Sequence, residues 1–94
     1  FNDLRLTDQM APTLRRTAGP DKVVIQKAVT GAEDFAFFQE KVPGLFVFVG
    51  GMSKGADPAT TAPHHTAGFM LDESGFTLGV RTLATLAADY LAMK

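Results

Sequence analysis

Apolar residues recur at helical spacing near the start of the chain, across residues 3–18. The repeating positions are Leu6, Met10 and Leu14. Residues four apart lie on one face of an α-helix, so the pattern predicts an amphipathic helix that begins with Asn2 as its N-cap and ends at Gly19-Pro20. Pro12 lacks a backbone N–H, so we expect a kink there or a helix that starts only after Thr7.

Two later segments show the same periodicity. Thr30 and Glu33 have the spacing of a capping box, which predicts a helix that ends at Pro43-Gly44. Its apolar residues are Phe35, Phe38 and Val42. The last helix should begin at Asp72, a good N-cap. Its apolar positions follow the i, i+3, i+4, i+7 pattern and are Phe76, Gly79, Val80, Leu83, Leu86, Ala87, Tyr90 and Leu91.

Between these helices, two short apolar runs favour β-strands. Residues 22–28 are rich in β-branched side chains, and residues 45–49 form a continuous apolar run closed by Gly50-Gly51. The order helix-strand-helix-strand-helix predicts an α/β fold with a parallel sheet. Two strands are too few for a stable sheet, so residues 1–94 are expected to be one unit that completes a larger domain. Residues 51–71 show no periodicity, which is typical of functional or disordered segments.

Composition narrows the possible functions. The 94 residues allow at most one small domain, and the absence of an initiator Met leads us to expect a segment of something longer. A net charge of −1 gives no electrostatic case for a nucleic-acid or anionic-membrane partner. No apolar run is long enough to span a bilayer. The chain has no cysteine, which excludes a disulfide framework and a thiolate metal cluster.

The two histidines of the chain are adjacent, at positions 64 and 65. Neutral imidazole is the commonest protein ligand for transition metals. A histidine pair in a polar loop is nevertheless more often a solvated surface feature, because a metal site needs three or four ligands. Neighbouring side chains in extended backbone point to opposite sides, so one metal ion would take His64 or His65 but not both.

Acidic residues at the start of the second predicted helix allow two interpretations. Glu33 and Asp34 can cap the helix and offset its dipole. They can also hold a carboxylate at the end of a strand, where open α/β sheets bind ligands, with Gly31 allowing close backbone approach. The segment Gly50–Gly55 does not fit a phosphate-binding loop, because its Lys precedes the final Gly.

Several motifs, in order, resemble the C-terminal part of the metal-dependent amidohydrolases and exopeptidases, the family of hippurate hydrolase, N-acyl-amino-acid carboxypeptidases and auxin-conjugate hydrolases. The motifs are Thr30-Gly31-Ala32-Glu33-Asp34-Phe35, Val42-Pro43-Gly44-Leu45-Phe46, Ala62-Pro63-His64-His65-Thr66, Asp72-Glu73, Leu78-Gly79-Val80 and Asp89-Tyr90-Leu91. The resemblance covers nearly the whole chain. Two positions depart from the family pattern: Ala67 replaces the usual Pro, and Gly68 precedes Phe69.

The resemblance implies a fold and a chemistry. The fold would be part of a zinc-peptidase-like three-layer catalytic domain, following an inserted lid domain. The activity would be metal-dependent hydrolysis of the amide bond of N-acyl amino acids or small peptides, with two zinc ions as cofactors. By this resemblance His65 is the metal ligand, with His64 as the alternative, and Glu33 and Gly31 lie at the substrate-binding pocket.

The same resemblance assigns the general base and the other metal ligands to residues upstream, so the isolated chain would be inactive. The full-length protein would bind a small-molecule substrate and could form a homodimer through its lid domain, with no nucleic-acid or membrane partner. A different hypothesis is a small non-enzymatic α/β module that binds a peptide through an open strand edge.

Overall fold

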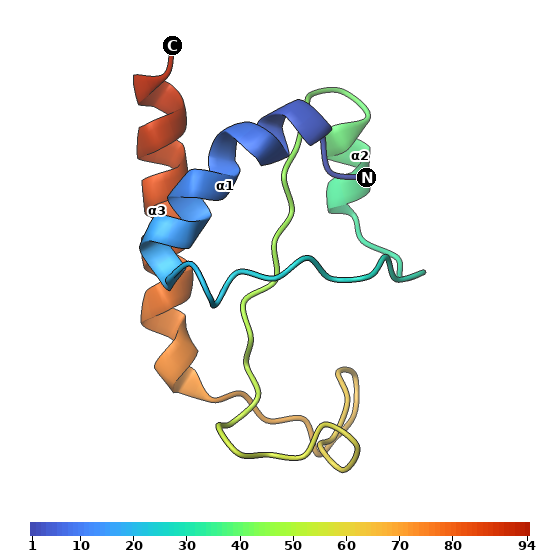
Figure 1. Ribbon diagram of the computed structural model, residues 1–94. Helices are drawn as coiled ribbons and strands as arrows, with labels where there is room; N and C mark the ends of the chain where they lie inside the picture. The colour runs from blue at the N-terminus through green and yellow to red at the C-terminus, as the bar shows by residue number, and fades with distance from the viewer.

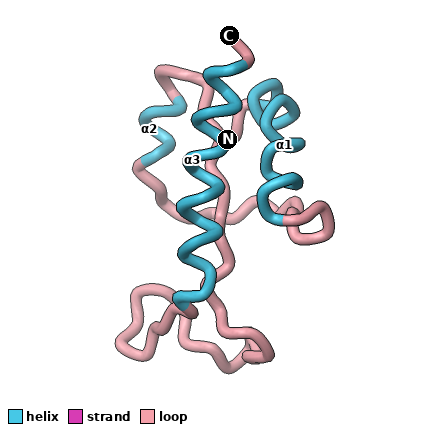
Figure 2. Tube along the Cα trace, turned by 90° about the vertical axis from the view of Figure 1, so that its left-hand side faces the viewer, coloured by secondary structure: helices cyan, strands magenta, loops and turns pink.

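The computed structural model describes residues 1–94 and is helical (Figure 1). Its elements are α1 (Leu4–Ala18), α2 (Phe35–Gln39), the 3₁₀ helix η1 (Glu73–Gly75) and α3 (Phe76–Ala92). The helices α1 and α3 pack against each other, whereas α2 contacts neither of them. Figure 1 shows α3 at one edge of the molecule, with α1 beside it and α2 farther away on the same side. Figure 2 shows the long loops that join these helices and no strand. None of the helices combines the length and apolar character needed to cross a membrane.

The predicted α/β fold, a helix-strand-helix-strand-helix piece of a three-layer domain, is wrong for this structure. Residues 22–28 and 45–49 belong to no sheet. In the first of these runs Val24 and Ile25 are 80% and 99% exposed. β-branched composition favours extended backbone, but a strand also needs a second backbone about 4.8 Å away to form a ladder. The chain supplies no such backbone to either run, so the two-strand sheet does not form.

The second run is instead held by a side chain. Asn2 Nδ2 donates to the carbonyl oxygen of Phe46, and the amide of Phe46 donates to Asn2 Oδ1, both at 2.8 Å. One amide side chain therefore satisfies both backbone groups of Phe46, as a neighbouring strand would. This contact also explains why Asn2 is not the cap of α1: Asp3 takes that position and accepts from the Leu6 amide at 2.8 Å.

The helix α1 runs through Pro12 without a break, so the alternative of a later start after Thr7 is wrong. The missing N–H of Pro12 leaves the carbonyl of Asp8 without a helical partner. Both Pro12 and Asp8 are exposed, so water can satisfy that carbonyl and the cost is tolerated. The predicted apolar stripe is correct: Met10 is 2% exposed, with Leu6 and Leu14 half-buried on the same face.

The helix α2 is shorter than its capping-box pattern predicts. It has five residues, and only a turn continues towards Val42, whose amide donates to Phe38 at 3.0 Å. The reciprocal Thr30–Glu33 box does not form. The Glu33 carboxylate accepts from the amide of Phe35 at 3.2 Å, two residues on. Isolated short helices are marginal, because few hydrogen bonds offset the fixed backbone.

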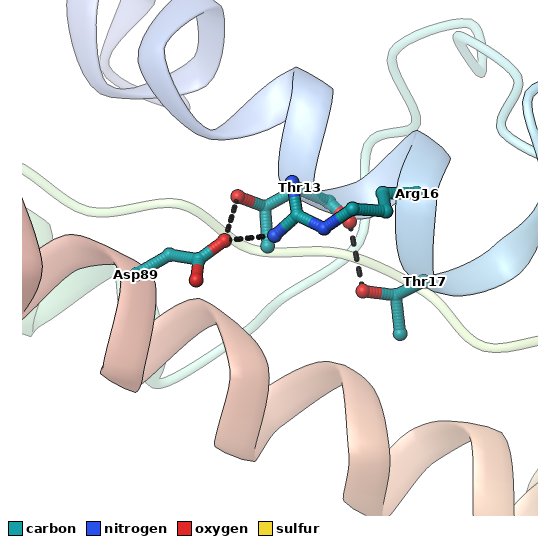
Figure 3. A network of polar contacts seen from close by, with 4 residues as sticks. All are labelled: Thr13, Arg16, Thr17 and Asp89. Atoms are coloured by element: carbon teal, nitrogen blue, oxygen red, sulfur yellow. Dashed lines mark hydrogen bonds and ion pairs between the residues drawn. The ribbon is translucent and has the colours of Figure 1, made fainter.

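Three side chains join α1 to α3 by polar contacts (Figure 3). Thr13, which is 2% exposed, donates its hydroxyl hydrogen to Asp89 Oδ2 at 2.6 Å, and the guanidinium of Arg16 bonds the same oxygen. Thr17 in turn donates to the carbonyl of Thr13 at 2.8 Å. The hydrogen bond from Thr13, and secondly that from Arg16, hold the pKa of Asp89 below its ordinary value of 3.8.

The lowered pKa of Asp89 gives a pH dependence with a definite sign. Because the folded-state pKa is depressed, the contribution of this carboxylate to stability is present above pH 3.8 and is lost as pH falls through the folded-state value. Thr13→Val and Arg16→Ala should each raise the pKa of Asp89, because each removes a hydrogen bond that lowers it. An NMR titration of the Asp89 carboxyl carbon measures both shifts, and an unchanged pKa in Thr13→Val would contradict the role given to the hydroxyl.

Candidate functional site

The two histidines lie in the long loop between Gly51 and Asp72, shown in yellow to orange in Figure 1. A backbone bond closes the base of this loop, from the Asp72 amide to the Gly51 carbonyl at 2.8 Å. The histidine turn itself is fixed by the Thr66 hydroxyl, which donates to the Pro63 carbonyl at 2.6 Å. Asp72 also accepts from the Ser74 amide at 2.9 Å, so the predicted cap forms, although a 3₁₀ turn precedes α3.

The base of the loop packs tightly because it contains glycine. A Cβ at Gly75 would lie 3.1 Å from the carbonyl oxygen of Gly50, and a Cβ at Gly51 would lie 2.4 Å from Leu71 Cδ2. The sequence suggested a flexible turn at Gly50-Gly51, whereas the structure has close contact between the loop and the start of α3. An apolar groove of about 370 Å³ lies beside this contact. It is lined by Val49, Gly50, Gly51, Leu71, Asp72, Gly75, Phe76, Gly79 and Val80.

This groove was not predicted from the sequence. The signal that could have indicated it is the recurrence of glycine at positions 50, 51, 75 and 79, which permits close backbone approach.

The backbone at the histidine pair is a turn and not extended, which removes the argument that the two rings point to opposite sides. His65 has a φ of 64° and is the only residue other than glycine with a positive φ. The two imidazole centroids are 6.4 Å apart. The His64 ring packs on Phe69 with a centroid distance of 4.4 Å, and both histidines are exposed. His64 therefore has a packing role that His65 lacks.

No group of three or more histidine, cysteine, aspartate or glutamate side chains converges in a way that could hold a metal ion. Zinc in proteins requires three or four such ligands. An exposed imidazole at His65 is chemically suited to be one of them, so these 94 residues can contribute part of a metal site but do not form one by themselves.

The two residues predicted at the substrate pocket are both exposed. The Glu33 carboxylate bonds the Phe35 amide, and the Glu33 carbonyl accepts from the Ala36 amide at 3.1 Å. Around Gly31, nothing lies within 4 Å of an added Cβ. No hydrogen bond joins Glu33 to the histidine turn, so the structure shows a helix-capping role for Glu33 and leaves its role in substrate binding a prediction.

Most of the known proteins similar to this chain are hydrolases by name. Thermostable carboxypeptidase 2 of Saccharolobus solfataricus is 32% identical over 95% of this chain. The IAA-amino acid hydrolase ILR1-like 5 of Arabidopsis thaliana is 38% identical over 78% of it, and the N-acetylcysteine deacetylase of Bacillus subtilis is 44% identical over 65%. A putative glutamate–cysteine ligase of Rhodococcus jostii also matches at 34% identity, but the chain spans only 10% of that protein.

No family model matches the chain, and no solved structure does. The run of carboxypeptidase, amino-acid hydrolase and deacetylase relatives confirms the resemblance inferred from the motifs. The chain therefore fits a segment of the amidohydrolase and carboxypeptidase family. It spans about a fifth of the length of the curated relatives it matches, 21% of the carboxypeptidase and 16% of the plant hydrolase.

The positive φ at His65 can be tested apart from any function. Glycine at position 65 should give a more stable protein than alanine, by up to about 1 kcal/mol, because a left-handed backbone disfavours any residue with a Cβ. At position 64, where φ is not positive, the order should reverse, with alanine more stable by about 0.5–1 kcal/mol. Urea denaturation of the four variants measures both differences, and the same order at both positions would contradict the left-handed assignment.

Proposed function

We propose that this chain is the segment of a metal-dependent hydrolase in which His65 supplies one metal ligand, and that the whole enzyme cleaves the amide bond of N-acyl amino acids or small peptides. The names of the relatives support the reaction class: one is a carboxypeptidase, one a hydrolase of IAA-amino acid and one a deacetylase of N-acetylcysteine. All three names describe substrates that contain an amino acid, and N-acetylcysteine is itself an N-acyl amino acid.

The observation that most supports His65 as the metal ligand is the positive φ of its backbone. Residues held in sparsely populated φ/ψ regions concentrate at ligand-binding and catalytic positions, where the surrounding structure maintains them. His65 is the one such non-glycine residue in this chain, and it is also the histidine that the family motif assigns to the metal. The packing of His64 on Phe69 supports the same choice, since His64 then positions the turn while His65 remains free to bind.

The proposed cofactor is a pair of divalent metal ions, with zinc the best match to imidazole. When bound, such ions polarise an amide carbonyl and lower the pKa of a water molecule. His65 can donate one nitrogen lone pair, and the other ligands and the general base would come from outside this chain. Glu33 and Gly31 are accessible, which is compatible with the proposed contact to substrate.

The competing hypothesis of a peptide-binding module with an open strand edge loses its basis, because the chain has no strand. The proposed dimer contact through the lid domain and the position of this chain after that domain remain predictions about the full-length protein.

Substitution of each histidine in the full-length hydrolase distinguishes a ligand from a packing residue. His65→Ala should lower zinc affinity by more than roughly 100-fold, because loss of an outer-shell partner alone costs 10–100-fold. His64→Ala keeps the ligand and should lower affinity by less than about 10-fold. Competition with a chromophoric chelator measures affinity, and hydrolysis of N-acetyl amino acids measures activity. Equal zinc affinity in the wild type and in His65→Ala would show that His65 is not a metal ligand.

The chain on its own should hydrolyse no N-acyl amino acid, because one imidazole does not hold zinc tightly. A coupled assay for free amino acid, with zinc in excess, measures this. Turnover that is abolished by a chelator would show that these residues form a complete catalytic site, and the proposal would be wrong.

A further inference from the structure

The chain exposes far more surface than a compact protein of its size. Its accessible surface is 8026 Å², whereas a folded monomer of the same mass has about 5,200 Å². The excess is about 2,800 Å². The radius of gyration is 14.8 Å, against about 12.4 Å for a compact chain of this length. Only four residues are buried, and Met10 is the one large apolar side chain among them.

The helix α3 shows where part of this excess lies. One face of α3 is buried or half-buried. Its residues are Leu78, Gly79, Thr82, Thr85, Leu86 and Asp89. On this face Asp89 bonds α1, whereas Gly79 lies against Val49. A second face is apolar and exposed, and we call it the outer stripe. Its residues are Phe76, Val80, Leu83, Ala87 and Leu91. At about 100° per residue these positions form one continuous line along the helix.

The exposure of the outer stripe is large. Val80, Leu83 and Leu91 are 72%, 73% and 68% exposed. Figure 2 shows α1 covering one side of α3 only. At its N-terminal end the outer stripe continues into the apolar groove, because Phe76 and Val80 line both. The sequence predicted a single apolar face for this helix, so the division into a covered face and an exposed stripe is a correction from the structure.

The excess exposed surface is too large to be buried by a second copy of the chain. A standard protein interface buries roughly 800 Å² per partner, less than a third of the excess. The exposed apolar side chains also face several directions from different elements, including Ile25 in the first loop and Phe48 before the long loop. A two-fold contact covers one patch, whereas this distribution requires a partner that surrounds the chain.

We propose that the outer stripe of α3 is the docking surface for the remaining polypeptide of the same hydrolase. The occupant is the part that the relatives carry outside the matched segment, about four-fifths of the carboxypeptidase. That polypeptide is large enough to cover the excess surface, and it is present at one copy per chain. The groove beside Gly75 receives an apolar side chain from it. This inference rests on the proposed function, because it requires the chain to be a segment of the hydrolase, but it does not depend on which histidine binds the metal.

Two adjacent alanines provide a matched test. Ala87 lies in the outer stripe, and Ala88 lies on the third side of α3, near Arg81 and away from both apolar faces. Both alanines are exposed in this chain, so Ala87→Glu and Ala88→Glu differ only in what covers them in the full-length protein. In that protein, Ala87→Glu should lower the Tm by roughly 5 °C or more, and Ala88→Glu by less than about 2 °C.

Thermal unfolding and sedimentation velocity of the two full-length variants decide the matter. Equal Tm shifts would overturn the proposal, because the outer stripe would then be solvent-facing in the whole protein. A wild-type dimer that Ala87→Glu converts to monomers would assign the outer stripe to contact between copies, which also overturns it.

Discussion

The carboxylate of Asp89 is the point at which the two long helices of this chain are joined by polar contacts. It receives a buried hydroxyl and a guanidinium from consecutive turns of α1, and Met10 lies on the same face one turn earlier. Charge-assisted hydrogen bonds are stronger than neutral ones, and they fix a geometry that apolar contact alone leaves free. With so small an apolar core, the register of α1 against α3 depends on this arrangement.

The local features of the fold could be predicted from the sequence, whereas features that depend on a distant partner could not. The stripe through Met10 and the cap at Asp72 are local patterns, and both form. The runs around Val24 and Phe46 are β-branched or apolar, but a sheet needs a neighbour that composition does not identify. The exchange of Asn2 for Asp3 as cap has the same cause, since Asn2 is recruited by Phe46, forty-four residues away.

The candidate site divides in the same way. The residue types at positions 64 and 65 and their motif indicated the family, which the relatives then confirmed. The left-handed backbone at His65 was not foreseeable, because neighbouring residues in a loop give no periodic signal for φ. The adjacency of Gly50 and Gly75 was equally hidden, since it joins positions separated by the whole loop. The same holds for any metal site assembled from distant segments. The candidate donor residues can be identified in the sequence, but whether they lie close together in the fold cannot.

The closed base of the long loop has a consequence for how such proteins diversify. The base is held by a backbone hydrogen bond between Gly51 and Asp72 and by backbone contact at Gly50, none of which involves a side chain within the loop. Lengthening a loop whose ends are already fixed costs little, since the entropy of closure grows only with the logarithm of its length. Insertions and deletions between Gly51 and Asp72 can therefore accumulate in homologues. They would change the surface beside the two histidines, while α3 would still begin at the same position.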